Sequence, residues 1–488
     1  DTGTGCSIMP PVSQADSLIS TGSGSQMKAL KVNEKHLKNI TIKTMKNLRL
    51  FAAVLVLLIS TLASSQNPVI RDQFTADPTA RVFNGKMYLF PSHDIPAPES
   101  FPRKDWFCMA DYHVFSSSDL TDWTDHGVIV SQENVAWVNP TSFSMWAPDC
   151  IERNGKYYFY FPANVKSGRG FGIGVAIADK PEGPYTPLPE PIANVMGIDP
   201  SVFIDKDGQA YIYYSLGRIF AAKLKDNMTE LASEPVVVGD LPTKGLVEGP
   251  FFFERNGIYY MTYPHVENTI ERLEYAIGDN PLGPFRVTGV IMDETPMGTW
   301  TNHHSLVQYN DQWYLFYHNS AYSPNFDKNR SVCIDSLFFN DDGTIRKVIP
   351  TNRGVGITGA QTTIEIDRFS QVSPTGVNVV LIDTTNTFLG WSAELKGQNS
   401  WISYNAVDFG RKKLKSVRVN ASSPAGGIIH IRLDNPDGLL LAEIEIPEST
   451  ALRTVDAKLK KYKKGIHNLF VVLKDENPVN IDWVQFGR

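Results

Sequence analysis

The sequence predicts an all-β protein in which a five-bladed β-propeller is followed by a β-sandwich domain of the jelly-roll type. A polar turn followed by an aromatic-rich strand recurs five times between residues 67 and 355. Short strands of alternating hydrophobicity fill residues 378–488, and no segment shows sustained helical periodicity. The chain has 488 residues, enough for two or three domains, and 42% of them are hydrophobic, enough to fill their cores.

Residues 1–66 are expected to lie outside these two domains. Residues 1–44 read as an unstructured upstream segment, because they are largely polar and lack periodicity. Residues 45–66 have the pattern of a signal peptide, with a basic start, an apolar run of 13 residues and small residues before a cut. That run is shorter than the roughly 20 residues of a membrane span, and a buried helix is the alternative. We therefore expect an exported protein, periplasmic or extracellular, with no membrane span after cleavage.

Five hairpin signals between residues 67 and 355 predict the propeller blades. Most of the turns contain Asn-Gly or Asp-Gly between strand-forming residues, which is typical of tight β-hairpins. Their equivalent positions are spaced 70, 53, 49 and 54 residues apart, and they are Gly85, Gly155, Gly208, Gly257 and Asp311. This spacing leaves room for about four strands in each unit. A β-sandwich is the alternative, but five copies of one hairpin favour radial repetition.

An ionisable residue precedes each of these hairpins at a similar offset. The inner strand of a propeller blade starts near the axis, so these residues are expected to converge at one mouth; they are Asp77, Asp149, Asp199, Glu248 and His303. Crowded carboxyl groups suit glycosidic cleavage, which needs one protonated carboxyl for the leaving oxygen and one ionised carboxylate for water or carbon. Crowding also separates their pKa values, so both protonation states become available near neutral pH. The alternative is that these acids cap turns or pair with Arg at strand ends.

The sequence around three of these acids resembles the catalytic motifs of glycoside hydrolase family 43. The matching stretches are Thr75-Ala76-Asp77-Pro78, Gly197-Ile198-Asp199-Pro200 and Glu248-Gly249-Pro250, and residues 145–149 and 303–305 also resemble that family. The resemblance covers about residues 67–355 and implies a five-bladed propeller and an inverting mechanism. It implies that Asp77 is the general base, Glu248 the general acid and Asp199 the group that tunes and orients the acid. In an inverting enzyme the base and acid carboxyls lie ~6.5–9.5 Å apart.

The same resemblance suggests further site residues. Arg330 resembles the substrate-binding arginine of the last blade, with a surface arginine as the alternative. Trp146 is a candidate wall for stacking a sugar ring, or else an ordinary core tryptophan, and Asp149 is a candidate substrate contact near it. The family often holds a calcium ion at the propeller axis near the position of His303, so a structural calcium ion is one hypothesis there. A core histidine or a substrate contact is the alternative, and no cofactor is expected for the chemistry itself.

The C-terminal part is expected to be a linker followed by a sugar-binding module. Residues 356–377 read as the linker, because they carry Gly, Thr, Ser and Pro. Residues 378–488 resemble carbohydrate-binding module family 6, which implies a site where aromatic side chains sandwich a sugar ring. The candidate binding residues are Trp401 and Tyr404 for an aromatic face and Asn480 for a hydrogen bond. Residues 449–454 lack the aromatic expected there, so a module that has lost sugar binding is the alternative.

Within the family, residues 71–78 look most like β-xylosidases and α-L-arabinofuranosidases. We therefore expect an inverting glycosidase that releases pentose, β-D-xylose above all, from the ends of xylan-derived oligosaccharides. The long stretch 94–112 could block one end of the cleft, which favours exo action. An α-L-arabinofuranosidase or a bifunctional enzyme on arabinoxylan is the alternative, and a catalytically inactive sugar-binding protein is the non-enzyme alternative. The net charge of −6 argues against nucleic acid as a partner.

Overall fold

The computed structural model describes residues 67–488 apart from residues 169, 246, 295–298, 324 and 384–388. All regular elements in this part of the chain are β-strands, as the sequence predicts. The expected upstream segment 1–44 and signal peptide 45–66 lie outside the described residues. The described residues contain no helix with the length and apolarity of a membrane span.

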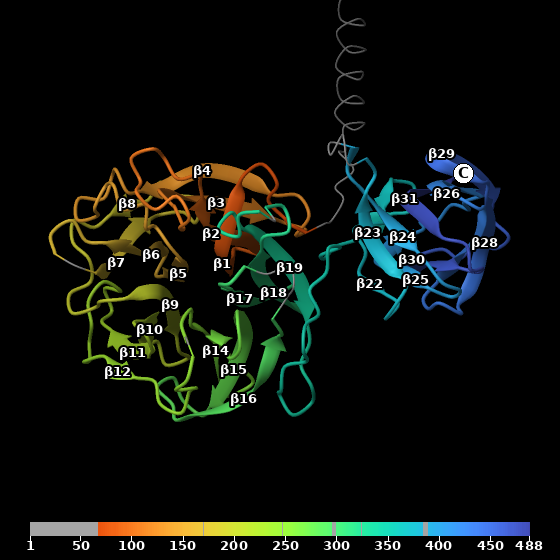
Figure 1. The fold of residues 1–488 in the computed structure, drawn as a ribbon. Coiled ribbons are helices and arrows are strands. Elements are labelled where there is room, and N and C mark those ends of the chain that lie inside the picture. Colours follow the sequence, from red (N-terminus) through yellow and green to blue (C-terminus); the bar gives the residue numbers. More distant parts are fainter. Residues whose placement is uncertain (1–66, 169, 246, 295–298, 324, 384–388) are drawn as a thin grey trace, which may run out of the picture. The chain divides into compact units, whose positions relative to one another are not determined.

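Five sheets surround a common axis and form the propeller (Figure 1). Four of these sheets have four strands each, and the fifth has three strands among the described residues. The first strand of each blade belongs to an inner ring, and β1 contacts both β5 and β17, which closes that ring. The inner strands are β1 (Phe74–Phe83), β5 (Asp149–Arg153), β9 (Ile198–Ile204), β13 (Phe251–Arg255) and β17 (Ser305–Tyr309).

The remaining propeller strands follow their inner strand outward in chain order, and every pairing between them is antiparallel. Blade 1 adds β2 (Lys86–Asp94), β3 (Asp111–Ser117) and β4 (Thr124–Ser131), and blade 2 adds β6 (Lys156–Asn164), β7 (Phe171–Ala178) and β8 (Thr186–Pro187). Blade 3 adds β10 (Ala210–Ser215), β11 (Ile219–Leu224) and β12 (Val236–Val237), and blade 4 adds β14 (Ile258–Val266), β15 (Glu271–Gly278) and β16 (Phe285–Met292). Blade 5 adds β18 (Gln312–Asn319) and β19 (Ser331–Leu337).

The predicted hairpin turns join the first and second strands of the blades. In blade 1, Asn84 and Gly85 have positive φ angles of 52° and 74°, as both central residues of a type I′ turn do. In blade 5, Asn310 and Asp311 have φ angles of 49° and 64°. Asn and Asp tolerate this left-handed region better than other non-glycine residues. Asp311 therefore takes the position that glycine holds in the two-residue turns of blades 1, 2 and 4, whereas the turn of blade 3 is longer.

Aromatic side chains fill the interfaces between neighbouring blades. Phe253 on β13 stacks on Tyr260 with ring centroids 4.6 Å apart, and it meets Trp313 of blade 5 at 5.1 Å. Phe252 on the same strand stacks on Tyr213 of blade 3 at 4.4 Å. Successive side chains of a strand point to opposite faces, so adjacent residues of β13 pack against opposite neighbours. This packing explains why the repeated hairpins are rich in aromatic residues.

A seam between the start of the propeller and blade 5 closes the ring. The Asn67 Oδ1 accepts a hydrogen bond from the backbone N–H of Ile334 at 2.8 Å, and its Nδ2 donates to the carbonyl of Thr351 at 2.7 Å. The backbone N–H of Val69 donates to the carbonyl of Val332 at 2.9 Å. The three cysteines among the described residues are free. Hydrogen bonds and packing therefore hold the seam.

The C-terminal domain is a sandwich of two sheets whose strands are mostly antiparallel. One sheet has the order β20-β25-β30-β27-β28 and the other the order β23-β24-β31-β26-β29, with β22 paired to β25 and β21 paired to β31. The strands are β20 (Thr358–Gly359), β21 (Ile364–Glu365), β22 (Gln371–Val372), β23 (Val377–Leu381), β24 (Trp391–Leu395), β25 (Trp401–Asp408), β26 (Ser416–Ser423), β27 (Gly427–Leu433), β28 (Leu439–Ile446), β29 (Ser449–Lys458), β30 (Ile466–Leu473) and β31 (Val479–Gly487).

The prediction that residues 356–377 form a linker is corrected by the structure, because most of this segment belongs to the sandwich. Three of the short strands lie within it, and they pair with β25 and β31. Ile364 and Ile366 are fully buried in the sandwich core. Each of these paired segments is only two residues long, so the linker-like composition around them hid their strands.

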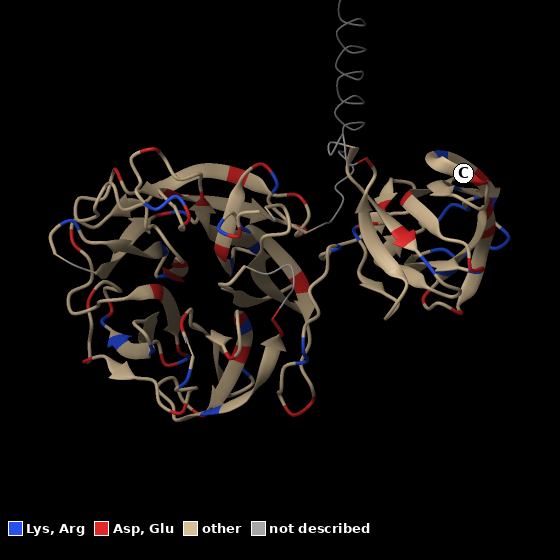
Figure 2. Ribbon diagram, in the orientation of Figure 1, with Lys and Arg blue, Asp and Glu red and all other residues tan. Residues whose placement is uncertain are grey.

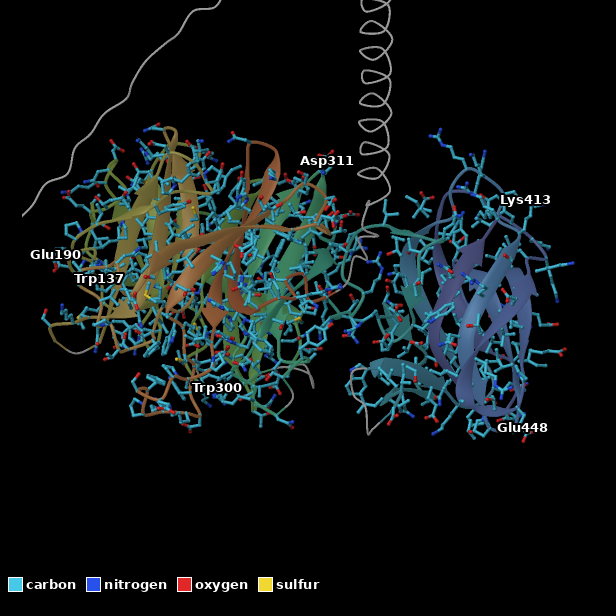
Figure 3. All side chains as sticks on the ribbon, turned by 90° about the horizontal axis from the view of Figure 1, so that it is seen from above. Trp137, Glu190, Trp300, Asp311, Lys413 and Glu448 are labelled. Atoms are coloured by element: carbon cyan, nitrogen blue, oxygen red, sulfur yellow. The ribbon has the colours of Figure 1, made fainter. Side chains whose placement is uncertain are left out.

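The two faces of the propeller carry different features. Acidic and basic residues are distributed together around its rim (Figure 2). The view from above places Trp300 at one face of the propeller and Asp311, in the blade 5 hairpin turn, at the opposite face (Figure 3). The face that carries Trp300 is the one on which the candidate site opens, because Trp300 lines its pocket.

Candidate active site

Residues from all five blades line one pocket of about 210 Å³ at the propeller axis. The pocket-lining residues are Asp77, Trp106, Phe107, Met109, Trp146, Ala147, Ile198, Asp199, Glu248, Trp300, Thr301, Asn302, His303 and Arg330. The structure therefore brings together all three acids predicted from the sequence, with Trp146, Arg330 and His303 beside them. Asp149 is the one predicted pocket residue that lies elsewhere.

Backbone bulges aim two of the acids at the axis. Asp77 and Asp199 have positive φ angles of 47° and 55°, and each precedes a proline. The pairing of β1 with β2 shifts register beside Asp77, and the pairing of β9 with β10 shifts register beside Asp199. A bulge of this kind redirects a side chain, and the strained φ is retained where function requires the geometry.

Blade 4 uses a different residue at the equivalent backbone position. Gly249, which precedes Pro250, has a φ of 54°, so the acid of this blade stands one residue earlier, at Glu248. A side chain at position 249 would place its Cβ 2.8 Å from the His303 Nδ1. Glycine is therefore needed for the close approach of the blade 4 backbone to this histidine.

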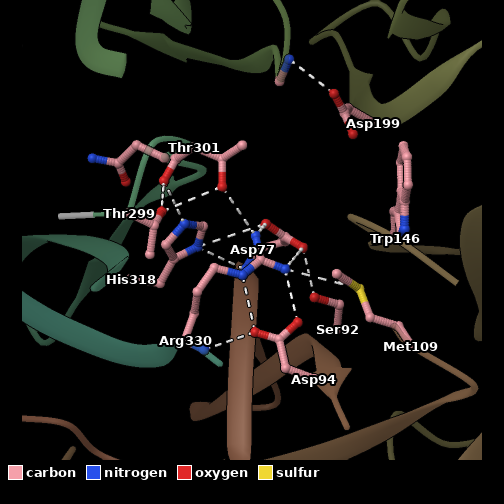
Figure 4. A network of polar contacts seen from close by, with 12 residues as sticks. Asp77, Ser92, Asp94, Met109, Trp146, Asp199, Thr299, Thr301, His318 and Arg330 are labelled. Carbon is pink, nitrogen blue, oxygen red and sulfur yellow. Dashed lines mark hydrogen bonds and ion pairs between the residues drawn. The ribbon is translucent and has the colours of Figure 1, made fainter. Parts of the chain in front are cut away.

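Asp77 is held as an ionised carboxylate by a dense polar network (Figure 4). The Arg330 Nη1 and Nη2 donate to its two oxygens at 2.8 and 3.1 Å, and the Ser92 Oγ donates at 2.6 Å. The backbone N–H of Asp77 donates to the His318 Nδ1 at 3.0 Å. Burial favours the neutral carboxyl, but Arg330, His318, His303 and Ser92 outweigh it and lower the pKa of Asp77 to about 2.

Arg330 is itself fixed from behind by Asp94. The Arg330 Nε and Nη2 each donate to an Asp94 oxygen at 2.9 Å, and the Arg330 backbone N–H adds a third bond at 2.8 Å. Its guanidinium also lies over the ring of Phe107, 4.7 Å from the centroid. Both Asp94 and Arg330 are almost fully buried, so this arginine bridges two carboxylates with little exposure to solvent.

Glu248 has the opposite protonation preference from Asp77. Burial raises the pKa of Glu248 to about 7, and the negative charge of Asp77 adds to the rise, against a hydrogen bond with Glu271 and the charge of Arg330. Burial also raises the pKa of Asp199 well above its usual range, followed by the charges of Glu248 and Asp77. The Asp199 Oδ2 accepts a hydrogen bond from the Gly249 N–H at 3.1 Å, which ties it to the chain beside Glu248.

Sequence reasoning missed several residues that support these acids. Glu271 on β15 is fully buried beside Glu248, and burial and the charge of Glu248 raise its pKa. Asp94, Ser92 and His318 contact Arg330 or Asp77 from second strands of their blades. Ser92 and Asp94 are two positions apart on β2, so their side chains point to the same face of the strand that pairs with β1. This alternation is the signal that could have identified them.

The prediction that Asp149 contacts substrate is wrong, because Asp149 does not line the pocket. Its carboxylate is fully buried and binds Arg81 of β1 at 2.6 and 2.8 Å, and it accepts the backbone N–H of Val202 at 2.6 Å. The reason is positional: Pro148 corresponds to Pro78, so Asp149 stands two residues beyond the position of Asp77. Asp149 therefore links blades 1, 2 and 3 and does not reach the pocket.

Aromatic rings form the wall of the pocket. Trp106 and Phe107 come from the segment 95–110, between β2 and β3, as expected for a stretch that narrows the cleft. Trp146 faces the pocket and packs against Phe171 at 4.7 Å, and Trp300 is 37% exposed at the mouth. These rings give the pocket apolar sides around a floor of carboxyl groups.

His303 lines the pocket, and among the described residues it does not belong to a group of three clustered metal-ligating side chains. Burial lowers the pKa of His303 to about 4, so the ring is neutral. Among the described residues, the one group of three clustered ligand side chains is His93, Asp111 and His113, which does not include His303. Calcium takes six to eight oxygen ligands. Water would therefore have to supply most of the ligands of a calcium ion at the axis.

The model of glycosyl hydrolases family 43 matches residues 65–345 of this chain. The chain belongs to this family. Its family 43 domain is a glycosidase domain, and a xylosidase/arabinosidase 43A from Humicola insolens is 39% identical to it, over 57% of this chain and 98% of the relative. The family 43 propeller also matches a β-xylosidase/α-arabinofuranosidase from a compost microbial metagenome, in complex with xylotriose and calcium-free, with a TM-score of 0.52 and 35% identity, over 58% of this chain and 97% of that one.

A third relative, also of family 43, matches over both domains. An arabinoxylan arabinofuranohydrolase from Bacillus subtilis, in complex with cellotetraose, matches with a TM-score of 0.51 and 25% identity, over 88% of this chain and 98% of that one. The model of carbohydrate binding module family 6 matches residues 375–488. The C-terminal sandwich is therefore a module of this second family.

One predicted sugar contact of the sandwich is wrong. Tyr404 is 1% exposed and belongs to the sandwich core, so its ring offers no face to a sugar. Trp401 is half-buried and packs against Phe470 with ring centroids 5.3 Å apart. The two residues are three positions apart on β25, so their side chains point to opposite sides of the strand. Asn480 is half-buried, and its Oδ1 has no hydrogen-bond partner among the described residues.

Proposed function

We propose that this protein is an inverting, exo-acting glycosidase that releases β-linked D-xylose from the ends of xylan-derived oligosaccharides. The observation that carries the proposal is the pairing of opposite protonation states in one pocket. Asp77 has a pKa of about 2 and Glu248 a pKa of about 7. Between these two values the pocket holds an ionised carboxylate and a protonated carboxyl, which are the two groups that inverting cleavage needs.

The proposed roles follow from these protonation states. Asp77 accepts a proton from a water molecule whose oxygen attacks the anomeric carbon, while the bond from that carbon to the leaving oxygen breaks. Glu248 donates its proton to the leaving oxygen, and both carboxyl groups then return to their starting states through exchange with solvent. Asp199 orients Glu248 through the Gly249 N–H. Arg330 positions Asp77 and reaches the pocket, where it can also donate to a sugar hydroxyl.

The shape of the pocket supports exo action. Trp106, Phe107 and Trp300 surround the acids, so the site is a small pocket and not a long groove. Trp146 provides an apolar face for a sugar ring. The relatives named as xylosidase/arabinosidases cover nearly the whole propeller, which supports a pentose as the sugar bound there.

An α-L-arabinofuranosidase, or an enzyme with both activities on arabinoxylan, is the second candidate. The observation in its favour is that an arabinoxylan arabinofuranohydrolase matches both the propeller and the sandwich. We also propose export to the periplasm or the extracellular space, on the basis of the apolar stretch in residues 45–66. A calcium ion at the axis would have His303 as a single nitrogen ligand and water for the rest.

Product analysis by NMR tests the proposal. The purified chain is mixed with xylobiose and with an arabinose-decorated xylo-oligosaccharide, and the anomer released first is recorded. We expect xylose as the initial α-anomer. Release of arabinose alone would favour the second candidate, and initial β-xylose would contradict inversion.

Isosteric variants separate catalysis from binding. Glu248→Gln removes the acid proton and is expected to abolish turnover, whereas Glu234→Gln changes an exposed carboxylate of blade 3 and serves as the matched control. A sugar-binding protein without catalysis would show no turnover in the wild type either.

A further inference from the structure

Two histidines and an aspartate gather on blade 1, and none of the three lines the pocket. The ligand atoms of His93, Asp111 and His113 all lie within 4.8 Å of one another. His93 Nδ1 is 2.7 Å from Asp111 Oδ1, and His113 Nε2 is 4.0 Å from the same oxygen. The three side chains are 19%, 23% and 17% exposed, so solvent can reach them.

A fourth residue sets the orientation of one of these rings. The Asp125 carboxylate is 2.9 Å from His113 Nδ1, and it also accepts the backbone N–H of Gly127 at 2.7 Å. An Nδ1–H that donates to Asp125 would leave the Nε2 of His113, which is 4.0 Å from the Asp111 Oδ1, free to bind an ion. A carboxylate that orients a histidine in this way is the usual outer partner of a metal-ligating imidazole. Phe115 stacks beneath the His113 ring at 6.0 Å and limits its rotation.

The ligand set indicates which kind of ion would bind. Calcium and magnesium prefer oxygen ligands throughout, whereas imidazole suits zinc, copper, nickel and iron. Two imidazole nitrogens and one carboxylate oxygen, all from one side, leave positions open for water. The His93 and His113 rings cross at 76° with centroids 5.2 Å apart, so their edges can converge on one ion.

We propose that His93, Asp111 and His113 form a binding site for a divalent transition-metal ion of the zinc class, with Asp125 orienting His113. The site lies apart from the glycosidase pocket and does not depend on the proposed function. Its ligands come from the end of β2 and the start of β3, which are the two ends of the segment 95–110. A bound ion would join the two ends of this segment. The segment supplies Trp106 and Phe107 to the pocket wall.

The position of His93 gives the ion a second structural consequence. Its chain neighbours Ser92 and Asp94 point the other way and contact Asp77 and Arg330. An ion on His93 would therefore hold the end of β2 from one side while the catalytic network holds it from the other.

Zinc titration of the full chain, without an affinity tag and after removal of metal with EDTA, tests the site. Calorimetry with ZnCl₂ is expected to show one tight site in the wild type that is lost in His93→Ala and in His113→Ala. Asp125→Asn is expected to weaken this binding by roughly 10- to 100-fold, as loss of an outer partner of a metal ligand does. His126→Ala is the matched control, because His126 is an exposed histidine that bonds to Ser116 and is not part of the cluster.

Two further readouts keep the test decisive. Zinc should raise the thermal midpoint of the wild type and of His126→Ala, because a ligand that binds only the folded state stabilises it, and it should not raise that of His113→Ala. Should either alanine variant fail to fold without metal, His93→Gln and Asp111→Asn replace it. Unchanged zinc binding in the folded ligand variants, or no zinc uptake by the wild type, would overturn the proposal.

Discussion

Replacing Arg330 tests whether its charge controls the protonation of the proposed base. Arg330→Gln removes two hydrogen bonds to Asp77 and two side-chain bonds to Asp94, and it leaves two buried carboxylates without a cation. An adjacent arginine lowers the pKa of an aspartate by roughly 1 to 3 units. Because Asp77 must be ionised to accept a proton, activity is lost as the pH falls through its pKa. We therefore expect the acid limb of kcat/KM to move from near pH 2 upward by roughly 1 to 3 units.

The assay is the pH profile of kcat/KM on p-nitrophenyl β-D-xylopyranoside for three variants. Arg330→Lys keeps the charge but loses the paired geometry, so it should retain most of the low acid limb. Arg330→Gln should also lower stability by about 3–5 kcal/mol, because it breaks a buried ion pair from one side. The double variant Arg330→Gln with Asp94→Asn removes one unpaired carboxylate and should recover part of that loss. An unchanged acid limb with only a raised KM would refute the reasoning and leave Arg330 as a substrate contact.

Three other predictions follow from the same structure. Glu248 must keep its proton, so kcat/KM of the wild type should fall as the pH rises through about 7, and a profile still rising at pH 8 would contradict its role as the acid. Asp149→Asn leaves Arg81 without its buried counter-charge and should lower the free energy of unfolding by about 3–5 kcal/mol in a urea titration, with little change in kcat for the folded fraction. Tyr404→Phe removes a buried hydroxyl that has no hydrogen-bond partner among the described residues, so it should be neutral or stabilising by about 1 kcal/mol. A clear loss of stability in Tyr404→Phe would show that this hydroxyl has a partner.

The repeats in the sequence were sufficient to predict the propeller and to place three acids at its axis. Hairpin turns and aromatic strands are local signals, and the inner strand of each blade begins at a fixed distance from them. The same spacing rule was wrong for Asp149, because a two-residue offset along a strand changes which neighbours a side chain meets. Spacing measured to the nearest repeat cannot resolve such an offset, whereas the prolines at positions 78 and 148 could have aligned the two strands.

The partners of Asp77 could not be predicted in the same way. Asp94 and Arg330 are 236 residues apart in the chain, and their contact depends on the closure of the ring. The prediction for Tyr404 was wrong for a different reason. Alternate residues of a sandwich strand point into the core or out to solvent, and the sequence alone did not show which set includes Tyr404. The short strands at residues 358–372 were missed because two-residue pairings leave no periodic pattern.

The seam that closes the propeller has a consequence for how the enzyme would fail. Asp77 belongs to blade 1, whereas Arg330 and His318, which hold it, belong to blade 5. The seam held by Asn67 joins these same two blades without a covalent link. Parting of the ring at this point would separate the base from its arginine while the other three blades stayed intact. Inactivation by heat or denaturant should therefore precede the loss of most secondary structure. The rate of inactivation would then measure how fast the seam of the propeller opens.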